Sequence, residues 1–162
     1  MARLALLPAV ALGLTLLAGC DEQPAEAGAV RWERLPDLPL AEREGPVVAW
    51  TGEVVLAVGG DTGEECPPTA DCEQPNAAAT DGAALDPATG TWRAIADAPR
   101  PVPAYSSSAL VGDELFVHVD RALLVYDTVR DRWRVLPRRV DGWYRPVADG
   151  DRLVLVHGSD EQ

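Results

Sequence analysis

The sequence predicts an all-β protein built from a repeated antiparallel unit, and three observations lead to this prediction. From Arg31 onward no helical periodicity lasts beyond a turn or two, and short β-branched runs alternate with Gly, Pro and Asp. A glycine followed by an acidic residue, at Gly52, Gly112 and Gly150, stands each time between two apolar runs. A tryptophan motif recurs along the same stretch, which is typical of a repeat protein.

Each Gly-acid pair is typical of a two-residue β-hairpin turn, because glycine adopts the positive φ that such turns require. An apolar run follows each turn, at 54–58, 115–119 and 153–157. The sequence therefore predicts three hairpins, each of which contributes two neighbouring strands to one sheet.

The motif Trp-x-x-[Leu/Ile] predicts the last strand of each unit. It begins at Trp32, Trp92 and Trp133, and the two intervals are 60 and 41 residues. Asp86 and Asp127 precede the later two tryptophans by six residues, where their side chains are expected to accept hydrogen bonds from the turn backbone. We expect the tryptophans to pack between units. Ligand stacking is the alternative.

The combined pattern resembles the kelch repeat, whose unit is one four-stranded blade of a β-propeller. The double glycine of that repeat is present as Gly59-Gly60 and is replaced by His118-Val119 and His157-Gly158 in the later units. Asp86 and Asp127 match the end of the third strand of that repeat, and Trp92 and Trp133 match its fourth strand. The resemblance implies kelch-type blades of four antiparallel strands across 31–158, with a β-sandwich of short strands as the alternative.

The predicted strands amount to about two and a half blades, at 46–97, 102–137 and 144–158. A propeller typically needs four to eight blades to close. In a closed kelch propeller the strand at Trp32 would complete the last blade. Three interpretations stay open: a truncated chain, identical chains that assemble to close a ring, and a smaller arrangement of sheets.

The first 20 residues predict a bacterial lipoprotein signal. Arg3 supplies the positive start, 4–17 the apolar run, and Leu17-Ala18-Gly19-Cys20 resembles the lipobox, in which the cysteine carries the lipid. The apolar run is about 14 residues, shorter than the ~20 of a membrane-spanning helix. An ordinary signal peptide is the alternative.

The signal defines the expected organisation of the chain. We expect a lipoprotein signal peptide at 1–19, a flexible acidic tether at 20–30 and the repeat domain at 31–162. The lipid on Cys20 would hold the domain outside the cytoplasm on a bacterial cell membrane.

Export also permits a disulfide, and Cys66 and Cys72 are the two cysteines left once Cys20 carries a lipid. A metal site is the alternative, although zinc needs more thiolates or imidazoles than this stretch supplies. Both cysteines lie in an acidic, proline-containing insertion at 61–81. We expect a stapled loop there, either solvated or in contact with a partner, with calcium binding as a further alternative.

The composition argues against nucleic-acid binding. The chain has 14 basic residues against 26 acidic ones and a net charge of −12. Such a surface repels phosphate groups.

Five side chains are candidates for ligand contact. His118 and His157 are predicted at the same place in successive units, where two imidazoles could face a shared pocket or metal. Tyr105, Trp143 and Tyr144 lie where inner strands begin, and an aromatic ring on the channel of a propeller could stack on a sugar. Packing is the alternative for all five.

The sequence shows no nucleophile with a matching base, no cofactor motif and no metal-ligand pattern. We therefore expect a non-catalytic module that binds a protein or a glycan. One alternative is a periplasmic sugar-isomerising enzyme similar to the sialic acid mutarotases of the kelch superfamily. The other is a truncated remnant without independent activity. The copper radical oxidase of galactose in that superfamily is disfavoured, because its chemistry needs a free cysteine for a tyrosine cross-link and copper-binding histidines.

Overall fold

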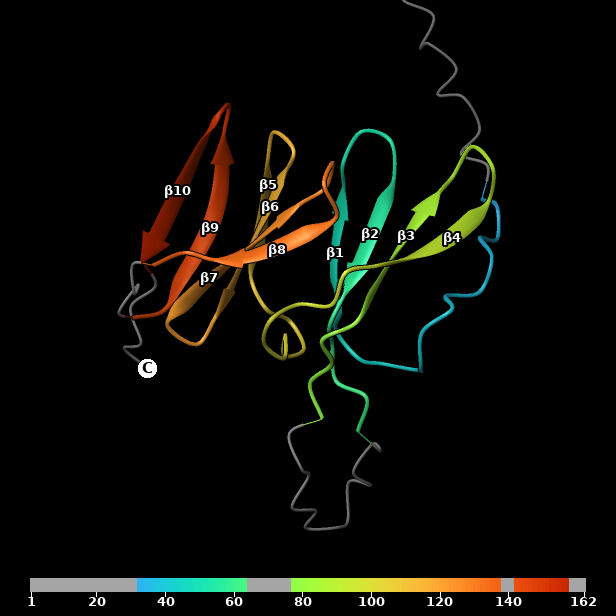
Figure 1. Cartoon of the computed structure of the whole chain (residues 1–162), viewed down its shortest axis with the longest axis horizontal. Helices are drawn as coiled ribbons and strands as arrows, with labels where there is room; N and C mark the ends of the chain where they lie inside the picture. The colour runs from blue at the N-terminus through green and yellow to red at the C-terminus, as the bar shows by residue number, and fades with distance from the viewer. Residues whose placement is uncertain (1–31, 64–76, 138–141, 158–162) are drawn as a thin grey trace, which may run out of the picture. The chain divides into compact units, whose positions relative to one another are not determined.

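A computed structural model describes residues 32–63, 77–137 and 142–157 of the chain (Figure 1). These residues form ten β-strands and, among themselves, no helix, which confirms the all-β prediction. In this part of the chain no helix is long and apolar enough to cross a membrane. The strands are β1 (Val47–Trp50), β2 (Val55–Val58), β3 (Gly82–Asp86), β4 (Thr91–Ile95), β5 (Ser108–Val111), β6 (Glu114–Val119), β7 (Ala122–Asp127), β8 (Arg132–Val135), β9 (Tyr144–Asp149) and β10 (Arg152–His157).

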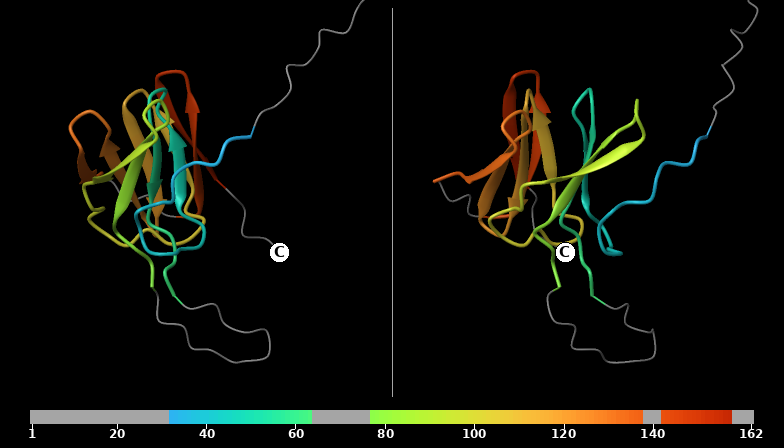
Figure 2. Two further views of the ribbon diagram at one scale, coloured as in Figure 1. Left: turned by 90° about the vertical axis from the view of Figure 1, so that its right-hand side faces the viewer. Right: turned by 45° about the vertical axis from the view of Figure 1, so that its right-hand side comes forward.

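The strands form three antiparallel sheets, none of them closed. The first sheet has the order β1-β2-β3-β4, the second β5-β6-β7-β8, and the third contains β9 and β10. Every strand pairs with its neighbours in the sequence, so each sheet is a simple meander. The sheets lie side by side with the second in the middle (Figures 1 and 2). Three sheets differ from the two packed sheets of a sandwich.

The predicted hairpins are present. Gly52, Gly112 and Gly150 have φ values of 98°, 55° and 62°. No atom lies within 4 Å of a Cβ added at any of the three, so the positive φ, and not crowding, is the reason for glycine.

A hydrophobic core joins the first and second sheets. Leu56 and Val58 of the first sheet pack with Leu115, Val117 and Tyr126 of the second. Strand β7 is buried along its whole length. Because side chains alternate along a strand, one half of β7 faces the first sheet and the other half faces the third.

The tryptophans join neighbouring units by a repeated hydrogen bond. The indole Nε1 of Trp133 donates to the carbonyl oxygen of Ala96 at 2.8 Å, and that of Trp92 donates to Pro36 O at 3.1 Å. The two acceptors occupy the same place in successive motifs. Ala96 lies four residues after Trp92, and Pro36 lies four residues after Trp32. The same contact is thus made twice.

The aspartates cap the turns before these tryptophans. An Oδ1 atom of Asp86 accepts hydrogen bonds from the backbone N–H groups of Ala88 and Thr89 at 2.8 and 3.3 Å. Asp127 accepts one from the Arg130 N–H at 2.9 Å. Both therefore act locally on the backbone.

The double glycine of the first unit is required by close approach. Gly59 has a φ of 64°, and a Cβ there would lie 2.4 Å from Val102 Cβ. Gly60 has a φ of 96°, and a Cβ there would lie 2.7 Å from the carbonyl oxygen of Glu44.

The strand register corrects the predicted repeat alignment by one residue. The turn glycines define the alignment. The sixth residue after each turn glycine is Val58, His118 or Val156, and the seventh is Gly59, Val119 or His157. The prediction that His118 and His157 occupy the same place is therefore wrong. Gly59-Gly60 corresponds to Val119-Asp120, and Asp120 has a positive φ of 53°, as Gly60 does.

Several predicted features lie outside the described residues. Cys20 and the tether belong to this group, and so do Cys66 and Cys72, so the predicted disulfide receives no support from the structure and stays a prediction. At the base of the insertion, Asp61 forms isolated bridges with Glu44 and Ala78. Trp32 is 91% exposed.

Candidate ligand-binding site

A pocket of about 370 Å³ lies where the loop before β5, the end of β6 and the residue before β9 meet. It brings together three of the five predicted ligand-facing residues. The pocket is lined by Pro103, Ala104, Tyr105, Ser106, Ser107, His118, Val119, Asp120 and Trp143.

His118 lies at the base of the pocket and is 6% exposed. Its backbone N–H donates to Ser107 O at 2.9 Å, but its Nε2 has no hydrogen-bond partner among the described residues. Burial lowers the pKa of this imidazole, although the nearby Asp120 carboxylate acts in the opposite direction. The ring is therefore neutral at pH 7.

The repeat explains why His118 lacks a partner. The corresponding residue of the first sheet is Val58, which is 1% exposed in the core with the second sheet. An imidazole thus occupies a position that an apolar side chain fills in the preceding unit. A buried polar atom without a hydrogen bond costs about 1–3 kcal/mol, so this histidine is not explained by packing.

Tyr144 lies between the two histidines. Its ring is 6.3 Å from that of His118 and 5.0 Å from that of His157, and both pairs meet edge-on. Tyr144 is the cross-strand partner of His157, so both face the second sheet, whereas His118 faces the third. The offset of one residue therefore places the two imidazoles in the same space between sheets.

Tyr105 and Trp143 form the rim of the pocket. Both lie seven residues before a turn glycine, at the position held by Gly45 in the first unit. Tyr105 is 74% exposed and has a φ of 60°, close to the 54° of Gly45. A tyrosine in this conformation is strained by about 1 kcal/mol or more.

Contacts with neighbouring side chains orient the two rim residues. The Tyr105 hydroxyl donates to Glu44 Oε1 at 2.6 Å, which raises the pKa of Tyr105. The guanidinium of Arg145 lies 5.3 Å from the centre of the Trp143 ring, and Trp143 is about half exposed. The rim thus presents two aromatic rings to solvent.

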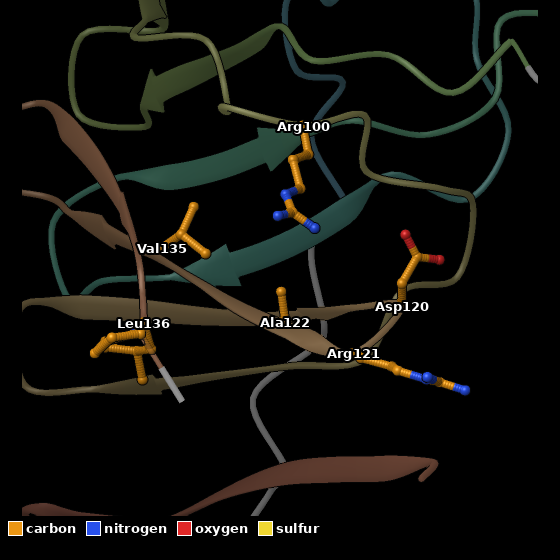
Figure 3. A pocket seen from close by; sticks show the side chains of 7 residues that line it. Arg100, Asp120, Arg121, Ala122, Val135 and Leu136 are labelled. Atoms are coloured by element: carbon orange, nitrogen blue, oxygen red, sulfur yellow. The ribbon is translucent and has the colours of Figure 1, made fainter. Parts of the chain in front are cut away.

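A second pocket, of about 440 Å³, adjoins the turn between β6 and β7 (Figure 3). Arg100 and Arg121 line it, with the Arg100 side chain pointing toward the other lining residues and that of Arg121 pointing away from them in Figure 3, and Asp120 lines both pockets. The sequence did not indicate these arginines. Their only signal is the short distance along the chain from Arg121 to His118.

Sequence reasoning also missed an ion pair beside the double glycine, in which the arginine is buried and the aspartate is partly exposed. The side chain of Arg43 is 2% exposed and donates to both carboxylate oxygens of Asp81, at 2.7 and 3.1 Å. It also donates to Gly59 O at 3.1 Å. These hydrogen bonds hold the pKa of Asp81 below its ordinary value.

Within the described ranges, no cluster of three or more His, Cys, Asp or Glu side chains could hold a metal ion. The two histidines beside Tyr144 thus lack a third ligand there. No family model matches the chain, and no curated protein matches it.

Proposed function

We propose that this chain is a membrane-anchored extracytoplasmic lipoprotein whose domain, a partial kelch-type propeller, binds a glycan. The lipobox sequence before Cys20 supports the anchor and the location. The three meandering sheets and the repeated tryptophan contact support the kelch interpretation.

The observation that carries the binding proposal is the pocket between Tyr105 and Trp143, with His118 at its base. Binding pockets combine apolar or aromatic walls with a few placed polar groups. The C–H face of a sugar ring stacks on exposed aromatic side chains, and its hydroxyls need hydrogen-bond partners. A neutral imidazole supplies both a donor and an acceptor.

The arginine pocket extends the proposal to the charge of the glycan. Asp120 joins the two pockets, and no carboxylate of the described residues pairs with Arg100 or Arg121. Guanidinium groups bind carboxylates well. A saccharide that carries a carboxylate at one end would fill both pockets, with the carboxylate in the pocket lined by the arginines.

The test is a glycan array with the full chain in detergent, followed by calorimetry with a bound saccharide. Trp143→Ala should weaken binding about tenfold or more, because stacking on an aromatic ring contributes on the order of 1.5 kcal/mol. Trp50→Ala, at an equally exposed tryptophan outside the pocket, is the matched control. Arg121→Ala should weaken only the carboxylated saccharides.

Equal losses with both tryptophan variants, or no retained glycan, would contradict the binding proposal. Conversion of a bound sugar between its anomers would favour the isomerase alternative. Metabolic labelling with palmitate tests the anchor separately, since Cys20→Ser should lose the label while the fold is unchanged.

A further inference from the structure

The face of the third sheet that is turned away from the second sheet carries three exposed valines, together with the charged residues Arg145, Asp149 and Arg152. Val147, Val154 and Val156 lie on it and are 45%, 40% and 51% exposed. Val147 and Val154 are direct cross-strand partners, so they form a continuous patch with Val156. We call this the β9–β10 outer face.

The repeat shows what such a face contacts elsewhere in the molecule. Counted from the turn glycines, Val154 and Val156 correspond to Phe116 and His118 of the second sheet. Those two side chains are 9% and 6% exposed, on the side of the second sheet that faces β9. The equivalent residues of the first sheet are in the core with the second. At both positions, the next sheet covers the face.

The first sheet carries the complementary surface. Val48 and Trp50 of β1 are 61% and 53% exposed, on the side away from the second sheet. Trp50 corresponds to Leu110 of β5, which packs against the core shared with the preceding sheet. We call this the β1–β2 outer face.

The two faces also match in position within their sheets. On the same side of the first sheet, Ala57 of β2 is 5% exposed and Ala83 and Leu85 of β3 are fully buried, so the exposed apolar side chains lie on β1. The three valines of the β9–β10 outer face lie on the strands that correspond to β1 and β2.

We propose that the β9–β10 outer face of one chain binds the β1–β2 outer face of a second copy, head to tail. The contact would repeat the packing of the first sheet on the second, with Trp50 against Val147 and Val154. Because the two faces differ, the interface is heterologous. The charge of −12 on each copy opposes association, so salt should strengthen it.

The test is sedimentation velocity of the full chain in density-matched detergent. Trp50→Lys and Val154→Lys each remove one face, and each should raise the dissociation constant about tenfold or more. A lysine also reduces the net negative charge, so charge repulsion would not explain the loss. Val129→Lys, at a 70% exposed valine in the turn between β7 and β8, is the control and should associate as the unmodified chain does.

Mixing the variants makes the test specific. Trp50→Lys retains an intact β9–β10 outer face, and Val154→Lys retains an intact β1–β2 outer face, so an equimolar mixture should form dimers and nothing larger. The milder pair Trp50→Gln and Val154→Thr, checked by circular dichroism, guards against unfolding.

An unmodified chain that stays monomeric at about 100 µM, far above the range of most specific complexes, would overturn the proposal. So would a mixture that behaves as its separate components, or a Val129→Lys variant that dissociates equally. Capture of a different protein by the β9–β10 outer face would likewise count against a second copy. Glycan binding is read separately, because none of these residues lines the pocket.

Discussion

The Trp133 indole and the Ala96 carbonyl, 2.8 Å apart, join the last strand of the second sheet to the end of the first. The Ala96 N–H donates in turn to Asp131 Oδ1 at 2.8 Å, and that oxygen also accepts from the Tyr126 hydroxyl at 2.6 Å. The backbone N–H and C=O of Ala96, the residue after β4, are therefore both hydrogen-bonded to side chains of the second unit. Burial raises the pKa of Tyr126 above its ordinary value, so this hydroxyl is protonated and donates at neutral pH.

Trp133→Phe should lower the free energy of unfolding by about 1–2 kcal/mol, because it removes this hydrogen bond and leaves a small void. Urea denaturation measures the loss. Trp92→Phe should cost less, since its bond to Pro36 is longer and exposed. Equal losses would show that side-chain volume, and not the hydrogen bond, determines the effect.

His118→Val should stabilise the domain by about 1–2 kcal/mol, because it removes a buried polar atom without a partner and restores the residue type of Val58. Thermal unfolding is the measurement. His157→Val, at an exposed histidine of the same cluster, is the control and should change little. A destabilised His118→Val variant would mean that the imidazole has a partner in solution.

The pH dependence of stability should identify the same histidine. Its folded pKa lies below the ordinary value of 6.5, so below pH 6.5 the unfolded chain binds more protons than the folded one. Stability should fall as the pH drops from 6.5, by at most about 1.4 kcal/mol per pH unit, until the folded pKa is reached. The His118→Val variant should lack this slope, and an unchanged slope would exclude His118 as its source.

Asp81→Asn should cost about 2–3 kcal/mol, because it leaves the buried Arg43 guanidinium without a carboxylate. The pKa of Asp81 is lowered in the folded state, so its contribution is present above pH 3.8 and is lost as the pH falls through the folded pKa. Denaturation at pH 7 and at acid pH measures both effects. The variant and the unmodified chain should converge in acid, and a constant difference would contradict this assignment.

Gly112→Ala should cost about 1 kcal/mol, since the only penalty is a positive φ in open space. Gly112→Asn should cost less, because asparagine tolerates this conformation. Gly59→Ala should cost clearly more, because its Cβ would overlap Val102. Similar denaturation midpoints for Gly112→Ala and Gly59→Ala would contradict the distinction.

The features that the sequence predicts well are local ones. A turn glycine and the apolar runs beside it are neighbours in the chain, so Gly52, Gly112 and Gly150 place their hairpins directly. The equivalence predicted for His118 and His157 is wrong because the later two units lack the double glycine, so that only the turn glycines define their register. Arg43 and Asp81 are 38 residues apart and have no shared motif. Only the packing of the first unit brings them together.

The candidate pocket was partly predictable for the same reason. Tyr105 and Trp143 are recognisable because both precede the first strand of a sheet at one repeat position. Arg100 and Arg121 come from a connection and a turn in different units, and no local pattern relates them.

The double-sided burial of β7 has a consequence for how the domain opens. Exchange of its backbone amides with deuterated solvent requires the hydrogen bonds to β6 and β8 to break, and because β7 is buried along its whole length this means that the second sheet unfolds. The third sheet, by contrast, can detach and leave the core of the first two sheets intact. The amides of β9 and β10 should therefore exchange first and those of β7 last, so that the domain melts from one end toward its middle.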